Sequence, residues 1–234
     1  HENLLQMIYQ VISAYFQDDC ADELTSDPVF NAILDKETLA SQPTLSRFFN
    51  RMNEDTLMQF DDMDKNLRDI IYSIKRPEHV LLDLDSTFYG RQEGEGFNFH
   101  YQAHGYHPLL CYDGLTGDML KAELRNGTLH CSNGADKFME PIFQEYLERN
   151  IKTYLRGDSG FSSPKLYETC EKNGCSYAIR LKQNASLIAL ASDKDENLYK
   201  TTQKDQIRYA VTYGEFMYQA GSWKYPRRVV FKIE

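Results

Sequence analysis

The spacing of hydrophobic and polar positions changes near residue 77. Before that point, apolar side chains recur at helical spacing, which predicts an all-helical region over residues 1–77. The segments that carry this pattern are 3–16, a stretch starting at Asp27-Pro28, Thr44 to Met52, and Glu54 to Ile74. Proline at the second of these starts is typical of the first turn of a helix.

After Arg76-Pro77, short apolar runs alternate with turn residues and amphipathic stretches. Three strands joined by turns are expected, followed by helix, strand, helix and strand, over residues 79–85, 106–112, 119–124, 133–150, 152–156, 164–173 and 175–181. Residues 88–102 are rich in glycine and predict a hairpin or loop. An antiparallel meander that leads into parallel α/β units forms one mixed sheet, in the order of the RNase-H-like fold.

The last part of the chain has a different pattern. Residues 192–234 are expected to form a β-strand insertion, with a solvated turn at 193–197 and strands over 208–213, 216–220 and 227–233. This gives three regions: a helical N-terminal region over 1–77, which is a candidate either for DNA binding or for ordinary helix packing, the first part of an RNase-H-like catalytic core over 78–191, and the insertion. The chain starts at His1 and stops after a strand-like run, so we expect a fragment whose core continues beyond residue 234.

Composition narrows the choice of function. The net charge of −9 argues against a surface that is a nucleic-acid footprint throughout, but a local basic groove remains compatible with it. No apolar run is long enough for a membrane span and no signal peptide is recognisable at the start. The 5 cysteines lack metal-type spacing, which favours a reduced, cytoplasmic protein.

Two strands end in an aspartate followed by small polar residues. Asp85 follows Leu82-Asp83-Leu84, and Asp158 follows Leu155-Arg156-Gly157. Either aspartate alone is as well explained as a cap of the next turn. Together, on strands that are neighbours in this fold, they predict a shared Mg²⁺ or Mn²⁺ site, because a carboxylate at a strand end needs a partner for its charge. Asp83 shares the strand face of Asp85, so it is either a supporting partner or the ligand itself.

These residues resemble the thirteen-eighty group of bacterial insertion-sequence DDE transposases. The resemblance is carried by Ser41 to Arg47, Leu82 to Thr87, Gly105 to Leu109, Leu124 to Gly127, Arg156 to Phe161, and Trp223 to Val230. It implies cut-and-paste DNA transposition, in which three carboxylates hold two Mg²⁺ or Mn²⁺ ions. Asp85 and Asp158 match the first two carboxylates. The third, a glutamate on a helix after the insertion, has no match before Glu234, so the resemblance implies a DDE transposase but leaves the activity of this fragment open.

The resemblance also implies DNA partners: the terminal repeats of the element and a target, bound by a homodimer in a synaptic complex. Candidate DNA contacts are Arg47, Arg51, Arg91, Arg156, Lys182, Trp223, Lys224, Arg227 and Arg228. Each cation is as readily a solvated charge or part of an ion pair, and Trp223 either stacks on a base or packs inside the β region. Two other functions stay open: a catalytically silent DNA-binding or assembly fragment, and a metal-dependent nuclease on the same scaffold.

Overall fold

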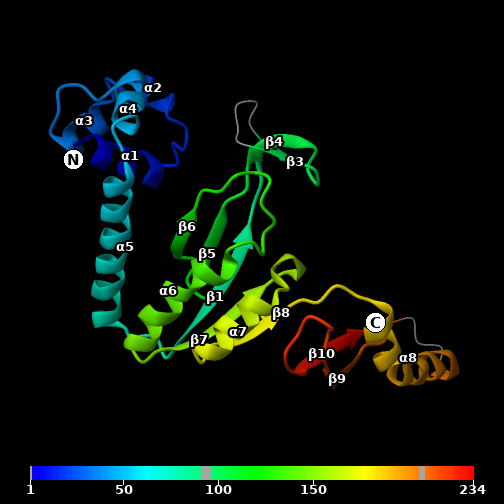
Figure 1. Cartoon of the computed structure of the whole chain (residues 1–234). Coiled ribbons are helices and arrows are strands. Elements are labelled where there is room, and N and C mark those ends of the chain that lie inside the picture. Colours follow the sequence, from blue (N-terminus) through cyan, green and yellow to red (C-terminus); the bar gives the residue numbers. More distant parts are fainter. Residues whose placement is uncertain (1, 91–95, 206–208) are drawn as a thin grey trace. The chain divides into compact units, whose positions relative to one another are not determined.

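The computed structural model describes residues 2–90, 96–205 and 209–234 (Figure 1). The chain divides into two compact units, His1–Ile74 and Lys75–Glu234. None of the helices within the described ranges combines the length and the hydropathy that crossing a membrane requires.

The first unit is helical, as its periodicity predicts. Its helices are α1 (Glu2–Ile12), α2 (Cys20–Leu24), α3 (Pro28–Leu34), α4 (Gln42–Phe49) and α5 (Glu54–Ile74). Asp27 caps α3, because its Oδ1 accepts from the backbone N–H groups of Val29 and Phe30, each at 2.9 Å. Leu24, Phe30 and Leu39 form a small core.

The second unit contains a five-stranded sheet in the order β6-β5-β1-β7-β8. Its strands are β1 (His79–Ser86), β5 (Leu109–Asp113), β6 (Met119–Glu123), β7 (Lys152–Gly157) and β8 (Ser176–Ile179). β5 runs antiparallel to both β1 and β6, whereas β7 runs parallel to both β1 and β8. This order and these directions are those of the RNase-H-like fold, which confirms the predicted fold class.

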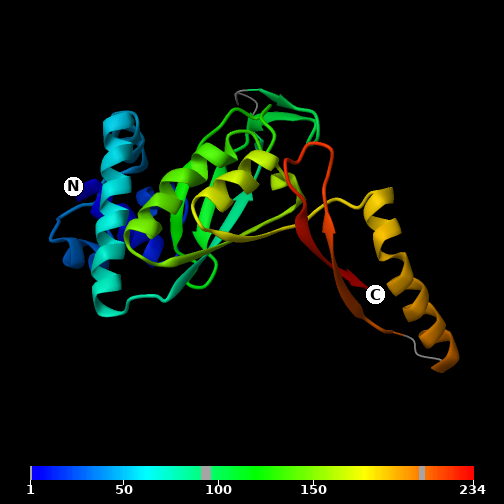
Figure 2. The ribbon, with the colours of Figure 1, turned by 60° about the horizontal axis from the view of Figure 1, so that its bottom comes forward.

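Two helices cover one face of this sheet, α6 (Ala135–Glu148) and α7 (Pro164–Lys172) (Figures 1 and 2). Both crossovers, from β6 to β7 and from β7 to β8, step the same way along the sheet, so right-handed connections place both helices on the same side. The covered face buries Val80, Leu82 and Leu84 of β1 and Leu155 of β7. The alternate positions of β1 and β7 therefore lie on the other, more exposed face.

A small second sheet lies where the sequence predicts a hairpin or loop over residues 88–102. β2 (Tyr89–Gly90) and β3 (Phe97–Asn98) both pair with β4 (Ala103–Tyr106). The strand predicted over 106–112 is thus split into β4 and β5, since His107-Pro108 interrupts the pairing. Gly105 permits a close approach, because a Cβ there would lie 2.1 Å from the carbonyl oxygen of Tyr89.

The C-terminal segment is not purely β, which corrects the prediction for residues 192–234. The helix α8 (Ala185–Asp205) runs through the expected turn at 193–197, and only β9 (Thr212–Tyr218) and β10 (Arg227–Ile233) are strands within the described residues. Asn184 starts α8 by accepting from the N–H of Leu187 at 2.9 Å. The charged run is compatible with a helix because it contains neither Gly nor Pro and forms a solvated helical face.

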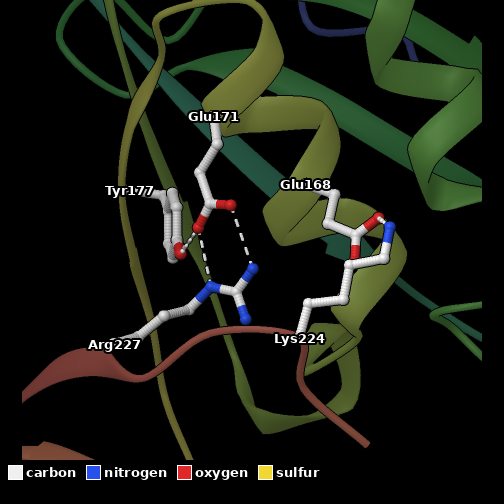
Figure 3. Close-up of polar contacts among 5 residues, drawn as sticks. All are labelled: Glu168, Glu171, Tyr177, Lys224 and Arg227. Carbon is white, nitrogen blue, oxygen red and sulfur yellow. Dashed lines mark hydrogen bonds and ion pairs between the residues drawn. The ribbon is translucent and has the colours of Figure 1, made fainter. Parts of the chain in front are cut away.

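Among the described residues, two ion pairs join the hairpin β9–β10 to α7, Arg227 with Glu171 and Lys224 with Glu168 (Figure 3). Arg227 donates from Nε and Nη2 to the two carboxylate oxygens of Glu171 on α7, at 2.6 and 2.9 Å. The hydroxyl of Tyr177 on β8 donates to the same carboxylate at 2.7 Å. The guanidinium also lies 5.3 Å from the ring centroid of Trp223. We call Glu171, Tyr177, Trp223 and Arg227 the hairpin clamp.

The hairpin clamp predicts an acid-sensitive stability. The Arg227 guanidinium, and then the Tyr177 hydroxyl, lower the pKa of Glu171 below its ordinary value of 4.5. A lowered pKa contributes stability above pH 4.5 that is lost as the pH falls through the folded-state pKa. Urea unfolding between about pH 5 and pH 3 should therefore show a steeper loss of stability for the wild type than for Glu171→Gln. Parallel curves for the two proteins would contradict this assignment.

Candidate active site

The register of β1 and β7 brings the two predicted aspartates together along the sheet. The parallel pairing ends with Leu84 opposite Gly157, and Asp85 and Asp158 are the next residue on each strand. Both lie at the carboxyl ends of neighbouring central strands. The side-chain alternation puts both on the face opposite α6 and α7, since Leu84, directly before Asp85, and Leu155, three residues before Asp158, are buried on the covered face.

Both aspartates are exposed, and each is held by one local hydrogen bond. Oδ1 of Asp85 accepts from the N–H of Ser86 at 2.8 Å. Oδ1 of Asp158 accepts from the N–H of Gly160 at 2.7 Å, which makes Asp158 the cap of the 3₁₀ turn η1 (Ser159–Phe161). The capping role that the sequence left open for Asp158 is therefore real. It engages Oδ1, while Oδ2 has no partner among the described residues.

Asp83 has a different environment. Nε of Arg156 donates to its Oδ1 at 2.7 Å, and Nη2 of Arg156 pairs with its Oδ2. The two residues face each other in the β1–β7 register. This hydrogen-bonded ion pair raises the pKa of Arg156. Asp83 and Arg156, predicted separately as a metal ligand and a DNA contact, thus neutralise each other beside Asp85.

The carboxylates of Asp85 and Asp158 are chemically suited to bind a divalent cation. Exposed carboxylate oxygens at a shared strand edge are the ligands that Mg²⁺ and Mn²⁺ prefer. Among the described residues, however, no group of three or more His, Cys, Asp or Glu side chains is placed to hold a metal ion. Asp85 and Asp158 would therefore supply two ligands and leave the remaining positions to water, substrate or a further carboxylate.

The loop before α6 packs against this strand end, which the sequence did not indicate. A Cβ built on Gly160 would lie 2.4 Å from Sγ of Cys131 and 3.0 Å from Oδ1 of Asp158. His130 precedes this cysteine, and its Nδ1 is 2.9 Å from Oγ of Ser132. The sequence offers no signal for this contact, because Cys131 belongs to no spaced motif.

We expect Gly160→Ala to destabilise the protein and Cys131→Ala to restore it. The added methyl group must displace Sγ of Cys131, and overpacking of this kind costs about 1–3 kcal/mol. Thermal unfolding of the two single variants and the double variant measures the coupling. Additive effects of the two substitutions would show that the loop does not press on Gly160.

The other predicted DNA contacts are placed in two ways. Arg47 and Arg51 are exposed in the first unit, where Nη2 of Arg47 donates to Oγ1 of Thr44 at 3.1 Å and the guanidinium of Arg51 lies 6.0 Å from the ring centroid of Phe48. In the second unit three of them are paired: Arg227 with Glu171, Arg228 with Glu215, and Lys224 with Glu168. Lys182 is exposed and has no ion-pair partner in the part of the chain that the structure describes. Arg91 lies outside the described residues.

Trp223 is buried and not presented for stacking. Its ring meets Tyr167 and Tyr218 edge to face, with centroids 5.4 and 5.5 Å apart. Only 9% of Trp223 and 9% of Arg227 is exposed. Of the two roles that the sequence left open for Trp223, the structure supports packing.

The mixed sheet with two carboxylates on its central parallel strands defines an RNase-H-like domain with a candidate cation site. The chain belongs to the transposase DDE domain group 1 family, whose model matches residues 1–234. A comparison with curated proteins found no match.

Two of the solved structures that are similar to part of this chain come from viral proteins. One is a chain of the simian T-cell lymphotropic virus intasome in complex with the PP2A regulatory subunit B56 gamma, with 13% identity over 56% of this chain and a TM-score of 0.32. The match spans 43% of that intasome chain, which is less than half of its length. The other is the catalytic core domain of BIV integrase, with 13% identity over 55% of this chain and 74% of that chain, and a TM-score of 0.31.

Proposed function

We propose that this chain is the catalytic part of a DNA transposase, which hydrolyses phosphodiesters and transfers DNA strands at the ends of an insertion sequence. One observation carries the proposal. Asp85 and Asp158 follow the last paired residues of adjacent parallel strands, in a chain whose family is that of transposase DDE domains. The motifs quoted above favour the thirteen-eighty group of bacterial elements as its closer relatives.

In this proposal Asp85 and Asp158 hold Mg²⁺ or Mn²⁺ in a two-ion site. When bound, such ions lower the pKa of an attacking water or 3′-hydroxyl and stabilise the leaving oxygen. The chain's own part is to fix the two carboxylates. The hydrogen bonds from Ser86 and Gly160 orient one oxygen of each. The Arg156–Asp83 pair keeps a third carboxylate from competing for the ions. A third carboxylate, as in the transposases that the chain resembles, would complete the ligand set.

The proposed partners are DNA, as terminal repeats and target, and a second copy of the protein in a paired-end complex. This dimer follows from the family alone. A transposase of this kind acts on the bacterial chromosome in the cytoplasm, which agrees with the unpaired cysteines.

A joining assay tests the proposed function. The chain and the full product of its gene are each incubated with Mg²⁺ or Mn²⁺, a supercoiled plasmid, and a labelled oligonucleotide with a free 3′-hydroxyl that carries the element's end. A transposase is expected to transfer label to the plasmid. Nicking without joining by the full product would favour the nuclease alternative, and binding without either reaction would favour the silent assembly fragment.

A further inference from the structure

A cavity of about 360 Å³ opens next to Asp158. Its walls come from three places in the second unit: the turn after Asp158, the segment from β8 into α8, and the end of the β9–β10 hairpin. The residues that matter for its chemistry are Ser159, Ser162, Lys182, Asn184, Tyr218, Ser222 and Trp223, with His130 at one side. The cavity therefore begins at the residue after a proposed ligand.

The lining consists of hydrogen-bond donors beside some apolar surface. No Asp or Glu is among the described residues that line it. The hydroxyl of Ser162 accepts from the Tyr167 hydroxyl at 2.9 Å, which leaves its own proton free to donate. Oδ1 of Asn184 is used by the N–H of Leu187, which leaves its Nδ2 group as a donor. Such a lining favours an anion.

Lys182 distinguishes this cavity from its surroundings. Arg156, Lys224, Arg227 and Arg228 each have a carboxylate partner in the second unit. Lys182 is exposed at the cavity and has no ion-pair partner among the described residues. An unneutralised ammonium among hydroxyl and amide donors, with no carboxylate among the described residues that line the cavity, is suited to a phosphate group.

The hairpin clamp holds the part of the cavity wall that comes from the β9–β10 hairpin, so this wall does not depend on a ligand. Arg227 and Glu171 fix the hairpin to α7 (Figure 3). Trp223 packs on Tyr167 of the same helix. The guanidinium of Arg227 covers the ring of Trp223 at 5.3 Å from its centroid, so that ring is poorly placed to stack on a base. These contacts favour the sugar-phosphate backbone over a nucleobase as the occupant.

We propose that this cavity binds a backbone phosphodiester of the DNA strand whose neighbouring phosphate reaches Asp85 and Asp158, with Lys182 as its cation. The inference rests on the proposed function and adds a substrate-positioning subsite to it. By binding one phosphate of the DNA strand in the cavity, the subsite would fix which phosphate of the same DNA strand reaches Asp85 and Asp158.

Trp223 makes the subsite observable, because it is the single tryptophan of the chain and it lines the cavity. Short duplex DNA is titrated into the 234-residue chain while Trp223 fluorescence and the anisotropy of labelled DNA are recorded at several salt concentrations. Lys182→Gln is compared with Lys152→Gln, a matched control at the exposed amino end of β7. Inorganic phosphate is titrated in a parallel arm.

We expect DNA to change the fluorescence of Trp223. Lys182→Gln should weaken DNA binding about eightfold at 0.1 M salt and lower the slope of log K against log salt by about 0.9, the value of one lost phosphate contact. Lys152→Gln should behave as the wild type. Inorganic phosphate should act only weakly, because it lacks the rest of the strand.

The failures are distinguishable. If DNA binds with unchanged Trp223 fluorescence and equal salt slopes for both lysine variants, the subsite is overturned while the proposed function stands. If inorganic phosphate alone gives the Lys182-dependent change and DNA does not, the cavity is a free-phosphate site and the inference is wrong. If neither the 234-residue chain nor the full product of its gene binds or joins DNA, both the subsite and the proposed function are wrong.

Discussion

Replacing Asp158 with Asn is expected to reduce metal-dependent DNA cleavage and joining by at least about 10²–10³-fold, the scale on which removal of one electrostatic stabiliser acts at an active site. The amide keeps the size of the side chain and can still accept from the N–H of Gly160. It removes the negative charge that would hold a divalent cation. Asp85→Asn should have an effect of the same order. The measurement is the rate of plasmid nicking and joining by the full product of the gene.

The matched control is Asp118→Asn. Asp118 is an exposed carboxylate in the turn between β5 and β6, and its Oδ2 accepts from Oγ1 of Thr116 at 2.8 Å. That turn lies at the opposite end of β1, since Gly114 donates its N–H to the carbonyl of Leu81. Activity should stay within about twofold of the wild type, as for surface changes remote from a site. Equal losses of nicking and joining activity in Asp118→Asn and Asp158→Asn would contradict the assignment of Asp158 as a metal ligand.

Asp85 and Asp158 show what the sequence can reveal about this protein. The apolar run before each of them predicts a buried strand, and the order of elements predicts that the two strands are neighbours. Within the sheet, the side-chain alternation then puts both carboxylates on one face. Local pattern and topology together are sufficient for this part of the fold.

Asp83 and Arg156 show where sequence reasoning stops. The sequence predicts a separate role for each residue, because the sequence of one strand does not show which residue of the other strand lies opposite. The structure aligns the two residues directly across β1 and β7, and their charges cancel. The alignment of two strands separated by a meander and a helix depends on tertiary packing, so no local pattern predicts it.

The turn predicted over 193–197 is wrong for a related reason. A run of Asp, Lys and Glu is compatible with a turn or with the solvated face of a helix, and the cap at Asn184 decides in favour of α8. For Trp223 and Arg227 the sequence leaves two roles open, a DNA contact or a structural role within the β region. Their burial arises from α7 and β8, which come from a distant part of the chain.

The second large effect is expected at the hairpin clamp. Arg227→Met should reduce the free energy of unfolding by about 2 kcal/mol, because the Glu171 carboxylate and the Tyr177 hydroxyl lose their shared partner. The value is below the range of about 3–5 kcal/mol for fully buried pairs. The reason is that the side chain of Glu171 remains 41% exposed, so water replaces part of the lost interaction. Urea unfolding followed by Trp223 fluorescence and by circular dichroism measures the change.

Arg228→Met provides the control on the same strand. Arg228 pairs with Glu215, but its side chain is 67% exposed, so its removal should change stability by less than about 0.5 kcal/mol. The two probes add a further distinction. If the clamp holds only the hairpin, the fluorescence of Trp223 in Arg227→Met changes at lower urea than the circular dichroism of the central sheet. If both variants unfold as the wild type does, the hairpin is held by apolar packing alone, and the wall of the phosphate cavity does not depend on the ion pair.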